Sequence, residues 1–159
     1  MILTEIIRDQ DEVIELLVGR KQIVGIFQGE SEWGPRALGN RSILFDPRHW
    51  DAKNIVNTIK KREEYRPFAG SIMAEHADEY FEMLQLPDSP WMSFAIQAKQ
   101  KAYDDIPSLV HADGTCRIQT VTREQNKNYY NLIEQFYKVT DVPIIFNTSF
   151  NLGGESLVE

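Results

Sequence analysis

The stretch 27–42 constrains the fold more than any other part of the sequence. It contains three glycines and two arginines, and it lies between two short apolar runs. The runs 22–28 and 42–45 are rich in β-branched and aromatic residues, which is typical of β-strands. The sequence therefore predicts a glycine-rich loop held between two strands.

The loop has part of the chemistry of a phosphate-binding loop. Gly29 and Gly34 have the spacing of the glycines in a Walker loop, but Pro35 and Arg36 stand where that motif needs Lys and Ser or Thr. The Walker motif is therefore absent. The glycines still allow backbone N–H groups to approach an anion, and Arg36 and Arg41 can each bind phosphate oxygens in a bidentate manner.

The sequence leaves two interpretations of this loop open. In the first, Arg36, Asn40 and Arg41 bind an anion. In the second, the glycines make tight turns and the arginines brace the loop against Glu30 and Glu32.

Hydrophobic periodicity predicts the other elements and an α/β or α+β fold around one twisted mixed sheet flanked by helices. A helix capped by Asp9 or Asp11 runs through Leu17. The remaining expected elements are helices over 50–62, 75–83 and 128–140, strands over 68–74, 92–98, 115–121 and 142–146, and a polar connection over 99–114.

Length and composition predict one globular domain over 1–159, because 159 residues with 42% hydrophobic content can bury a core. We expect a cytoplasmic protein, since there is no apolar run long enough to span a membrane and no N-terminal signal pattern. The single cysteine, Cys116, lies in an alternating apolar run, which predicts a buried, unreactive thiol.

The net charge of −7 makes nucleic acid an unfavourable partner, because affinity for a phosphate backbone depends on Lys and Arg. Basic residues nevertheless concentrate between Arg36 and Arg66. This distribution favours a local anion site in an acidic protein, and a solvated charged face is the alternative.

Three further clusters could complete such a site. Lys60, Arg62 and Arg66 precede the strand expected at 68–74, although a solvated helix end explains them equally well. His111 and Arg117 flank an Asp-Gly turn; two potential ligands, His111 and Asp113, are too few for a metal site.

The third cluster comprises Asn147, Thr148, Ser149 and Asn151, which follow the last expected strand. Strand ends in α/β sheets often contact ligands, and a simple polar turn is the alternative.

Four motifs in this order resemble the C-terminal domain of O-carbamoyltransferases, a family that includes nodulation-type and antibiotic-tailoring enzymes. The motifs are Gly34-Pro35-Arg36-Ala37-Leu38-Gly39-Asn40-Arg41-Ser42, Arg66-Pro67-Phe68-Ala69, the segment from His111 to Val121, and Asn147-Thr148-Ser149-Phe150-Asn151 with Gly154-Glu155. The resemblance covers nearly the whole chain.

The resemblance implies a YrdC-like α/β fold and the formation of carbamoyladenylate from ATP and carbamoyl phosphate, with Mg²⁺ on the triphosphate. It also implies that the chain is a fragment of a two-domain enzyme. An N-terminal transferase domain in cis, with a histidine-held iron, would pass the carbamoyl group to an acceptor hydroxyl. The sequence itself names no acceptor.

The resemblance also implies roles for individual residues. The implied catalytic residues are Lys60, Arg62, Arg66 and Arg117. The implied substrate-binding and nucleotide-binding residues are Arg36, Asn40, Arg41, Ser71, His111, Asn147, Thr148, Ser149 and Asn151. One departure is that Ala69-Gly70-Ser71 stands where relatives often have Ala-Pro-Ser, which keeps Ser71 but softens the turn.

Three alternative functions remain open at this point. The chain could resemble a threonylcarbamoyl-adenylate synthase, although the Gly-Pro-Arg-Ala-Leu-Gly segment differs from that class. It could be an RNA-binding YrdC-type domain, against which the net charge of −7 argues. It could also be a non-catalytic module that senses nucleotide.

Overall fold

A computed structural model describes residues 9–159, and its centre is one mixed sheet of six strands. Residues 1–8, which belong to the expected single domain, lie outside the described residues. The strands are β1 (Val24–Phe27), β2 (Arg41–Phe45), β3 (Ala69–Met73), β4 (Ala95–Gln97), β5 (Thr115–Val121) and β6 (Ile144–Ser149). Their order is β1-β2-β6-β3-β5-β4, with β3 and β5 parallel and the other neighbours antiparallel.

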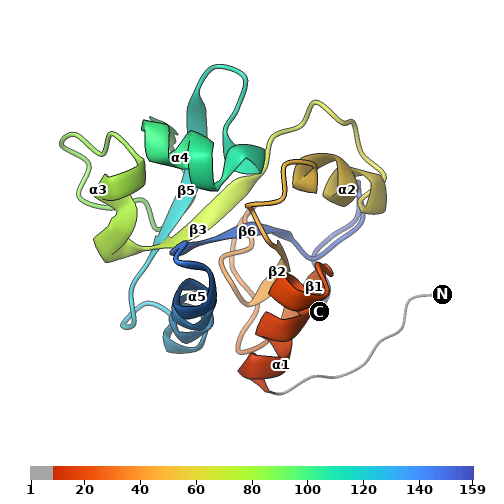
Figure 1. Ribbon diagram of the computed structural model, residues 1–159. Helices are drawn as coiled ribbons and strands as arrows, with labels where there is room; N and C mark the ends of the chain where they lie inside the picture. The colour runs from red at the N-terminus through yellow and green to blue at the C-terminus, as the bar shows by residue number, and fades with distance from the viewer. Residues whose placement is uncertain (1–8) are drawn as a thin grey trace.

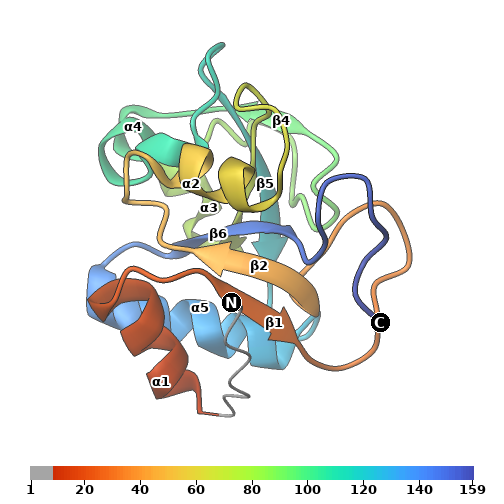
Figure 2. The same cartoon turned by 90° about the vertical axis from the view of Figure 1, so that its right-hand side faces the viewer.

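Helices cover both faces of this sheet. The α-helices are α1 (Gln10–Ile14), α2 (Ala52–Ile59), α3 (Ala77–Tyr80), α4 (Gln100–Asp105) and α5 (Lys127–Thr140). A π-helical turn, Glu15–Gly19, continues α1, and short 3₁₀ turns occupy Ala74–His76 and Pro107–Leu109. Both views show α1 and α5 on one side of the sheet and α2, α3 and α4 on the other (Figure 1, Figure 2). The expected fold class is confirmed.

The helix ends follow the local sequence. Asp9 is the N-cap of α1, and its side chain accepts a hydrogen bond from the backbone N–H of Asp11. Asn126 caps α5 in the same way through the N–H of Tyr129, and Asp141 ends the helix in the left-handed conformation. The apolar side of α5 is buried against the sheet, as its period predicts.

The core lies on both sides of the central strands. Phe68 and Phe146 pack with their ring centroids 4.6 Å apart, and both side chains are buried. Ile72, Ile144 and Leu109 are also almost fully buried beside them. This packing makes β3 and β6 the rigid middle of the sheet, and both strands reach the candidate site.

The expected polar connection over 99–114 is wrong in part. It contains the helix α4 and the 3₁₀ turn Pro107–Leu109. Ala102 is the only residue of α4 that is buried, so the helix has no apolar stripe for periodicity to detect. An ion pair between Lys101 and Asp105, at 3.0 Å, supports its exposed side instead.

The boundary of the last strand also differs from the expectation. The sequence predicts a strand over 142–146 with polar residues after it, but β6 continues to Ser149. Asn147 pairs with Leu44 on β2 and with Ala69 on β3, and Ser149 pairs with Ser42. Because strands flank β6 on both sides, backbone pairing extends the strand through these polar residues.

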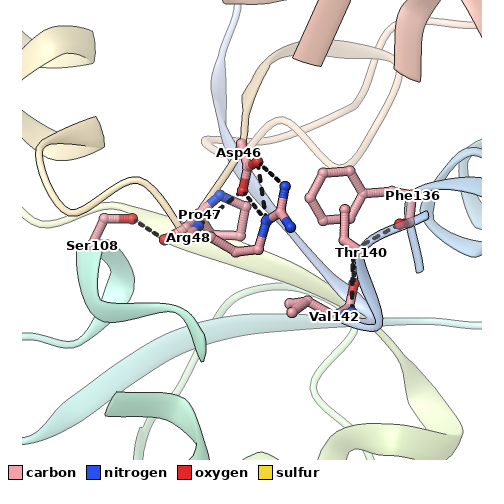
Figure 3. A network of polar contacts seen from close by, with 7 residues as sticks. All are labelled: Asp46, Pro47, Arg48, Ser108, Phe136, Thr140 and Val142. Carbon is pink, nitrogen blue, oxygen red and sulfur yellow. Dashed lines mark hydrogen bonds and ion pairs between the residues drawn. The ribbon is translucent and has the colours of Figure 1, made fainter. Parts of the chain in front are cut away.

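A second set of polar contacts fixes the chain after β2 (Figure 3). The guanidinium of Arg48 binds the buried carboxylate of Asp46, with Nη2 2.6 Å from Oδ2. The hydroxyl of Ser108 donates to the carbonyl of Pro47 at 2.8 Å. These contacts join the turn after β2 to the connection before β5.

None of the helices within residues 9–159 combines the length and the apolar character that crossing a bilayer requires.

Candidate functional site

Positive charge gathers around a cleft at the end of the sheet where β6 finishes and β3 and β5 begin. The cleft has a volume of about 350 Å³, and four arginines line it: Arg36, Arg62, Arg66 and Arg117. No Asp or Glu is among the residues that line it within the described chain. Four cations around one open space favour an anionic ligand.

The loop of 27–42 forms one wall of this cleft. Figure 2 shows that loop, in orange, and the segment after β6, in dark blue, at the same right-hand end of the molecule. Backbone bonds join the two segments, since the N–H of Phe150 donates to the carbonyl of Arg41 at 2.9 Å. Residues from opposite ends of the sequence therefore meet at the cleft.

Arg117 lies on β5 and is the most constrained of the four cations. Its backbone pairs with Ala69 on β3 and with Ala95 on β4. Its Nε is buried and has no hydrogen-bond partner among residues 9–159. Burial lowers the pKa of its guanidinium, and the charge of Arg36 lowers it further. A buried guanidinium N–H without a partner is costly, and an anion in the cleft would satisfy it.

Arg62 is held in place by its neighbours. Its Nε donates to Oδ1 of Asn57 at 2.5 Å, and its guanidinium carbon lies 3.9 Å from the ring centroid of Phe68. Burial, followed by the charges of Arg66 and Arg117, lowers the pKa of Arg62 to about 10. These contacts fix the cation before a ligand arrives.

Arg66 and Arg36 are exposed at the mouth of the cleft. Arg66 forms an ion pair with Glu63, with its Nε 3.0 Å from Oε2. Arg36 donates from Nη1 to the carbonyl of Pro35 at 3.1 Å, and it has no carboxylate partner among residues 9–159. Because both side chains are exposed, they can reorient to contact a ligand, at a cost in side-chain entropy.

The polar residues at the end of β6 also line the cleft. They are Asn147, Thr148 and Ser149. Asn147 is almost completely buried, whereas Thr148 and Ser149 are partly buried. The sequence predicted that these three residues share a site with the arginines, and the structure brings them together with Arg36, Arg62, Arg66 and Arg117 but not with Arg41.

Glu32 organises the glycine-rich loop through backbone groups rather than through the arginines. Its Oε1 accepts from the N–H groups of Leu38, Asn40 and Arg41 at 2.8, 2.6 and 3.3 Å. A carboxylate that accepts several backbone N–H groups makes strong, charge-assisted hydrogen bonds. The loop therefore keeps its shape without an anion.

Arg41 stabilises the loop from within. Its Nη1 donates to the carbonyls of Gln28, Gly29 and Asn40, and its guanidinium carbon lies 3.6 Å from the ring centroid of Phe27. Arg41 is buried and does not line the cleft, whereas Arg36 does. Arg41 therefore braces the loop, but through backbone carbonyls and not against Glu30 or Glu32 as expected, because no ion pair joins it to either carboxylate among residues 9–159. Arg36 lines the cleft, where its contact with an anion stays a prediction.

A buried amide network fastens the loop to the sheet. Nε2 of Gln119 donates to the carbonyl of Leu38 at 3.0 Å, and Nδ2 of Asn147 donates to the carbonyl of Ala37 at 3.2 Å. The hydroxyl of Ser71 donates to Oε1 of Gln119 at 2.7 Å and accepts from Asn147 at 2.9 Å. Ser71 thus lies behind the cleft wall and does not line the cleft.

Lys60 is buried beside the segment after β6. Its Nζ donates to the carbonyls of Ser149 and Asn151 at 2.5 and 2.9 Å, and to Oδ1 of Asn151 at 2.8 Å. Burial, and then the charge of Arg62, lowers the pKa of Lys60 to about 8. In this structure Lys60 and Asn151 form a clamp outside the cleft lining, and their contact with a ligand stays a prediction.

Asn40 and His111 also hold backbone or side chains rather than line the cleft. Nδ2 of Asn40 donates to the carbonyl of Glu30 at 2.8 Å, and its Oδ1 accepts from Asn126 at 2.9 Å. The ring of His111 lies between the carbonyl of Phe68 and the hydroxyl of Thr115, each at 3.2 Å. Their predicted binding roles stay predictions.

A second cleft, of about 400 Å³, lies beside the contacts drawn in Figure 3. Lys21, Arg48, Asp46 and Trp50 are among the residues that line it. Asp46 binds the guanidinium of Arg48 with both oxygens, which neutralises that charge within the protein. Charge rather than volume therefore selects the four-arginine cleft as the anion site.

Within residues 9–159, no group of three or more His, Cys, Asp and Glu side chains is arranged to hold a metal ion.

Sequence reasoning missed two residues that position the site. Asn57 is fully buried on α2 and accepts a hydrogen bond from Arg62. It lies beside the apolar stripe of the helix, and hydrophobic periodicity does not show that a polar residue there has a structural role. Gln119 supports the loop. Its position inside a buried strand of alternating pattern was the sequence feature that could have identified it. A buried amide in such a strand needs partners, which predicts a network.

The chain matches one family model and is similar to several nodulation proteins. Residues 15–159 match the family model described as carbamoyltransferase C-terminus. Nodulation protein NolO of Bradyrhizobium diazoefficiens is 46% identical over 142 residues, which cover 86% of this chain and 25% of NolO. Nodulation protein NolNO of Sinorhizobium fredii is 49% identical over 142 residues, which cover 86% of this chain and 20% of NolNO.

Nodulation protein U of Sinorhizobium fredii is 38% identical over 143 residues, which cover 90% of this chain and 25% of that protein. The chain therefore spans about a quarter of the length of these curated relatives. The match over residues 15–159 shows that the chain belongs to the carbamoyltransferase C-terminus family.

Proposed function

We propose that the four-arginine cleft binds ATP and carbamoyl phosphate and forms carbamoyladenylate. The single observation that carries this proposal is the cleft itself, which four arginines line and in which the buried Nε of Arg117 has no partner among residues 9–159. Two phosphorylated substrates bring several negative charges to one site. Clustered arginines are suited to hold them together despite their mutual repulsion.

The proposed chemistry has two steps. Carbamoyl phosphate reacts with water to give carbamate and inorganic phosphate. A carbamate oxygen then attacks the α-phosphorus of ATP, forming the new P–O bond as pyrophosphate leaves with the electrons of the broken bond. Both steps move negative charge among phosphate oxygens, so positioning and cationic stabilisation contribute most to the rate.

The residues of the cleft suit these tasks. Arg62 and Arg117 are held by the fold, which favours binding of the charge that develops on the transferred groups. Arg36 and Arg66 are exposed at the mouth, where they can neutralise the departing phosphate or pyrophosphate. Mg²⁺ would accompany the triphosphate and be held mainly by phosphate oxygens.

The complete transfer reaction requires more than this domain. We propose that an N-terminal transferase domain in cis takes the carbamoyl group from the adenylate to an acceptor hydroxyl. The curated relatives support this, because the matched part is about a quarter of their length.

Product analysis tests the proposed half-reaction. The chain is incubated with ATP, Mg²⁺ and carbamoyl phosphate, and in parallel with ATP, Mg²⁺, threonine and bicarbonate. Pyrophosphate release and the mass of the adenylate are measured in both. We expect carbamoyladenylate and pyrophosphate only with carbamoyl phosphate.

Two results would contradict this proposal. Threonylcarbamoyl-adenylate as the product would assign a different acyl substrate. Binding of ATP without pyrophosphate release under either condition would indicate a nucleotide-sensing module.

A further inference from the structure

Asn147 lines the cleft and carries a buried hydrogen-bond acceptor that no residue within 9–159 uses. Oδ1 of Asn147 is buried and has no donor partner among residues 9–159. The Asn147 side chain is almost completely buried, with 1% of its surface exposed, and it lines the cleft. An unsatisfied buried amide oxygen costs free energy in the empty site, so it indicates a position for a donor on the ligand.

The buried amide network fixes which atom of Asn147 is the oxygen. Nδ2 must be the atom near the carbonyl of Ala37, because a carbonyl only accepts hydrogen bonds. Gln119 is oriented in the same way, since its Nε2 donates to the carbonyl of Leu38 and its Oε1 accepts from Ser71. The unpartnered atom of Asn147 is therefore an acceptor, and it requires an N–H or O–H group.

The same row of the sheet places this acceptor beside the cations. Ala69 on β3 pairs with Asn147 on one side and with Arg117 on the other. Paired residues on neighbouring strands direct their side chains to the same face, and two strand spacings separate the two backbones by about 10 Å. Both Asn147 and Arg117 line the cleft, so a ligand of about this length can reach both residues.

We infer that Oδ1 of Asn147 accepts a hydrogen bond from the NH₂ group of the carbamoyl substrate while Arg117 binds its phosphate. This inference rests on the proposed function and adds the basis of substrate choice. An acyl phosphate with a methyl group in place of NH₂ would leave the buried oxygen unpaired, so the site would discriminate against it. Asn147 is thus the specificity residue for the carbamoyl group.

Adenine also carries an NH₂ group that could donate to the same oxygen. The carbamoyl group is favoured because it is bonded directly to a phosphate, and Asn147 is in the same sheet row as Arg117. The base of ATP is separated from its phosphates by the ribose. The two possibilities can be distinguished with a nucleotide whose base lacks the NH₂ group. If Asn147 binds adenine, replacing Asn147 should weaken ATP binding but not binding of that nucleotide.

A pair of stable phosphonates tests the inference. Phosphonoacetamide and acetonylphosphonate differ at one group. The carbonyl carbon bears NH₂ in phosphonoacetamide and CH₃ in acetonylphosphonate. Calorimetric titration of the chain should show phosphonoacetamide binding about tenfold or more tightly. Asn147→Ala should reduce this ratio to about one, because the acceptor is gone.

Two further variants separate recognition from folding. Ser89→Ala is the matched control, because Ser89 is a buried polar residue that bonds to β5 outside the cleft lining. It should keep the tenfold preference. Asn147→Asp retains an oxygen at this position and should keep more of the preference than Asn147→Ala.

The outcomes distinguish this inference from the proposed function. Equal binding of the two phosphonates to the unmodified chain, or no binding of either, would overturn the inference even if carbamoyladenylate forms. A clear preference for phosphonoacetamide without pyrophosphate release would support the inference and contradict the adenylation reaction. If Asn147→Ala weakens ATP but not purine riboside triphosphate, and the phosphonate ratio is unchanged, the oxygen serves adenine and the inference is wrong.

Discussion

Arg117 and Asn147 occupy one row of the sheet, each paired with Ala69 from opposite sides. The first has a buried donor without a partner, and the second has a buried acceptor without one, among the residues that the structure describes. A donor and an acceptor left unsatisfied in the same cleft indicate a ligand with both negative charge and a polar N–H group.

Gly39 is required where the loop passes over α5. It has φ of +114°, and an added Cβ would lie 2.2 Å from the buried ring of Tyr129. Gly39→Ala should lower the free energy of unfolding by about 3 kcal/mol or more, from backbone strain and overpacking together. Chemical denaturation measures this loss.

Gly34→Ala is the matched control for that variant. Gly34 has φ of +134°, but nothing lies within 4 Å of an added Cβ. It should lose only about 1–2 kcal/mol, from the backbone term. Equal losses for the two variants would mean that Tyr129 does not constrain the loop.

Asn57→Ala tests how Arg62 is positioned. Asn57 accepts from Arg62 and donates to the carbonyls of Glu64 and Arg66 at 3.2 and 3.3 Å. Its removal leaves buried groups unsatisfied, so we expect a loss of about 1–3 kcal/mol in the free energy of unfolding and weaker ATP binding. Denaturation and calorimetry measure the two effects.

Asn54→Ala provides the comparison on the same helix. Asn54 is exposed and bonds only to Asp51, at 2.7 Å, through its side-chain amide. Its replacement should change stability by less than about 0.5 kcal/mol and leave ATP affinity unchanged. If both asparagine variants behave alike, the buried contacts of Asn57 do not position Arg62.

Particular residues show how far the sequence determines this fold and site. The period of α5 and the strand-type runs around the glycine-rich loop predict elements that the structure contains, because burial of one face requires those patterns. Four of the five predicted arginines and the polar end of β6 line one cleft, whereas Arg41 does not.

The sequence was less informative where contacts between distant segments decide the outcome. Arg36 and Arg41 are similar in sequence context, yet Arg41 is buried against loop carbonyls and Arg36 lines the cleft. Helix α4 was missed because its one buried residue gives no periodic signal. Lys60 was expected in the cleft, whereas its Nζ bonds to the carbonyl of Ser149 at the end of β6, 89 residues away in the sequence.

The buried amine of Lys60 should make the free energy of unfolding depend on pH in the alkaline range. Its pKa is lowered from 10.5 to about 8, so between these values the unfolded chain binds more protons than the folded chain. The free energy of unfolding should therefore rise with pH across this window, relative to a Lys60→Met variant. Below pH 8 the folded protein bears the full cost of burying the charged amine.

Denaturation of both proteins at pH 7, 8, 9 and 10 measures this difference. The variant serves as the control because it retains all the other titrating groups. A difference that stays constant, or that falls as the pH rises, would show that the Lys60 amine is not destabilised by burial.

Cys116 should be unreactive in the folded protein. Burial raises the pKa of its thiol to about 12, and the charge of Asp113 contributes. At pH 8 only about one in ten thousand Cys116 side chains is then present as the thiolate. The side chain is also inaccessible to solvent. A thiol reagent should label the unfolded chain completely and the folded chain hardly at all; rapid labelling of both would contradict this burial.

The most direct test of the arginine cleft is ATP affinity. Calorimetric titration should show that Arg117→Ala weakens ATP binding more than tenfold, because a buried charge-assisted contact is worth about 1.5–3 kcal/mol. Arg123→Ala is the control, since Arg123 is a surface cation paired with Glu134 outside the cleft lining, and it should change the affinity less than twofold. Equal ATP affinity in the unmodified chain and the folded Arg117→Ala variant would contradict the account.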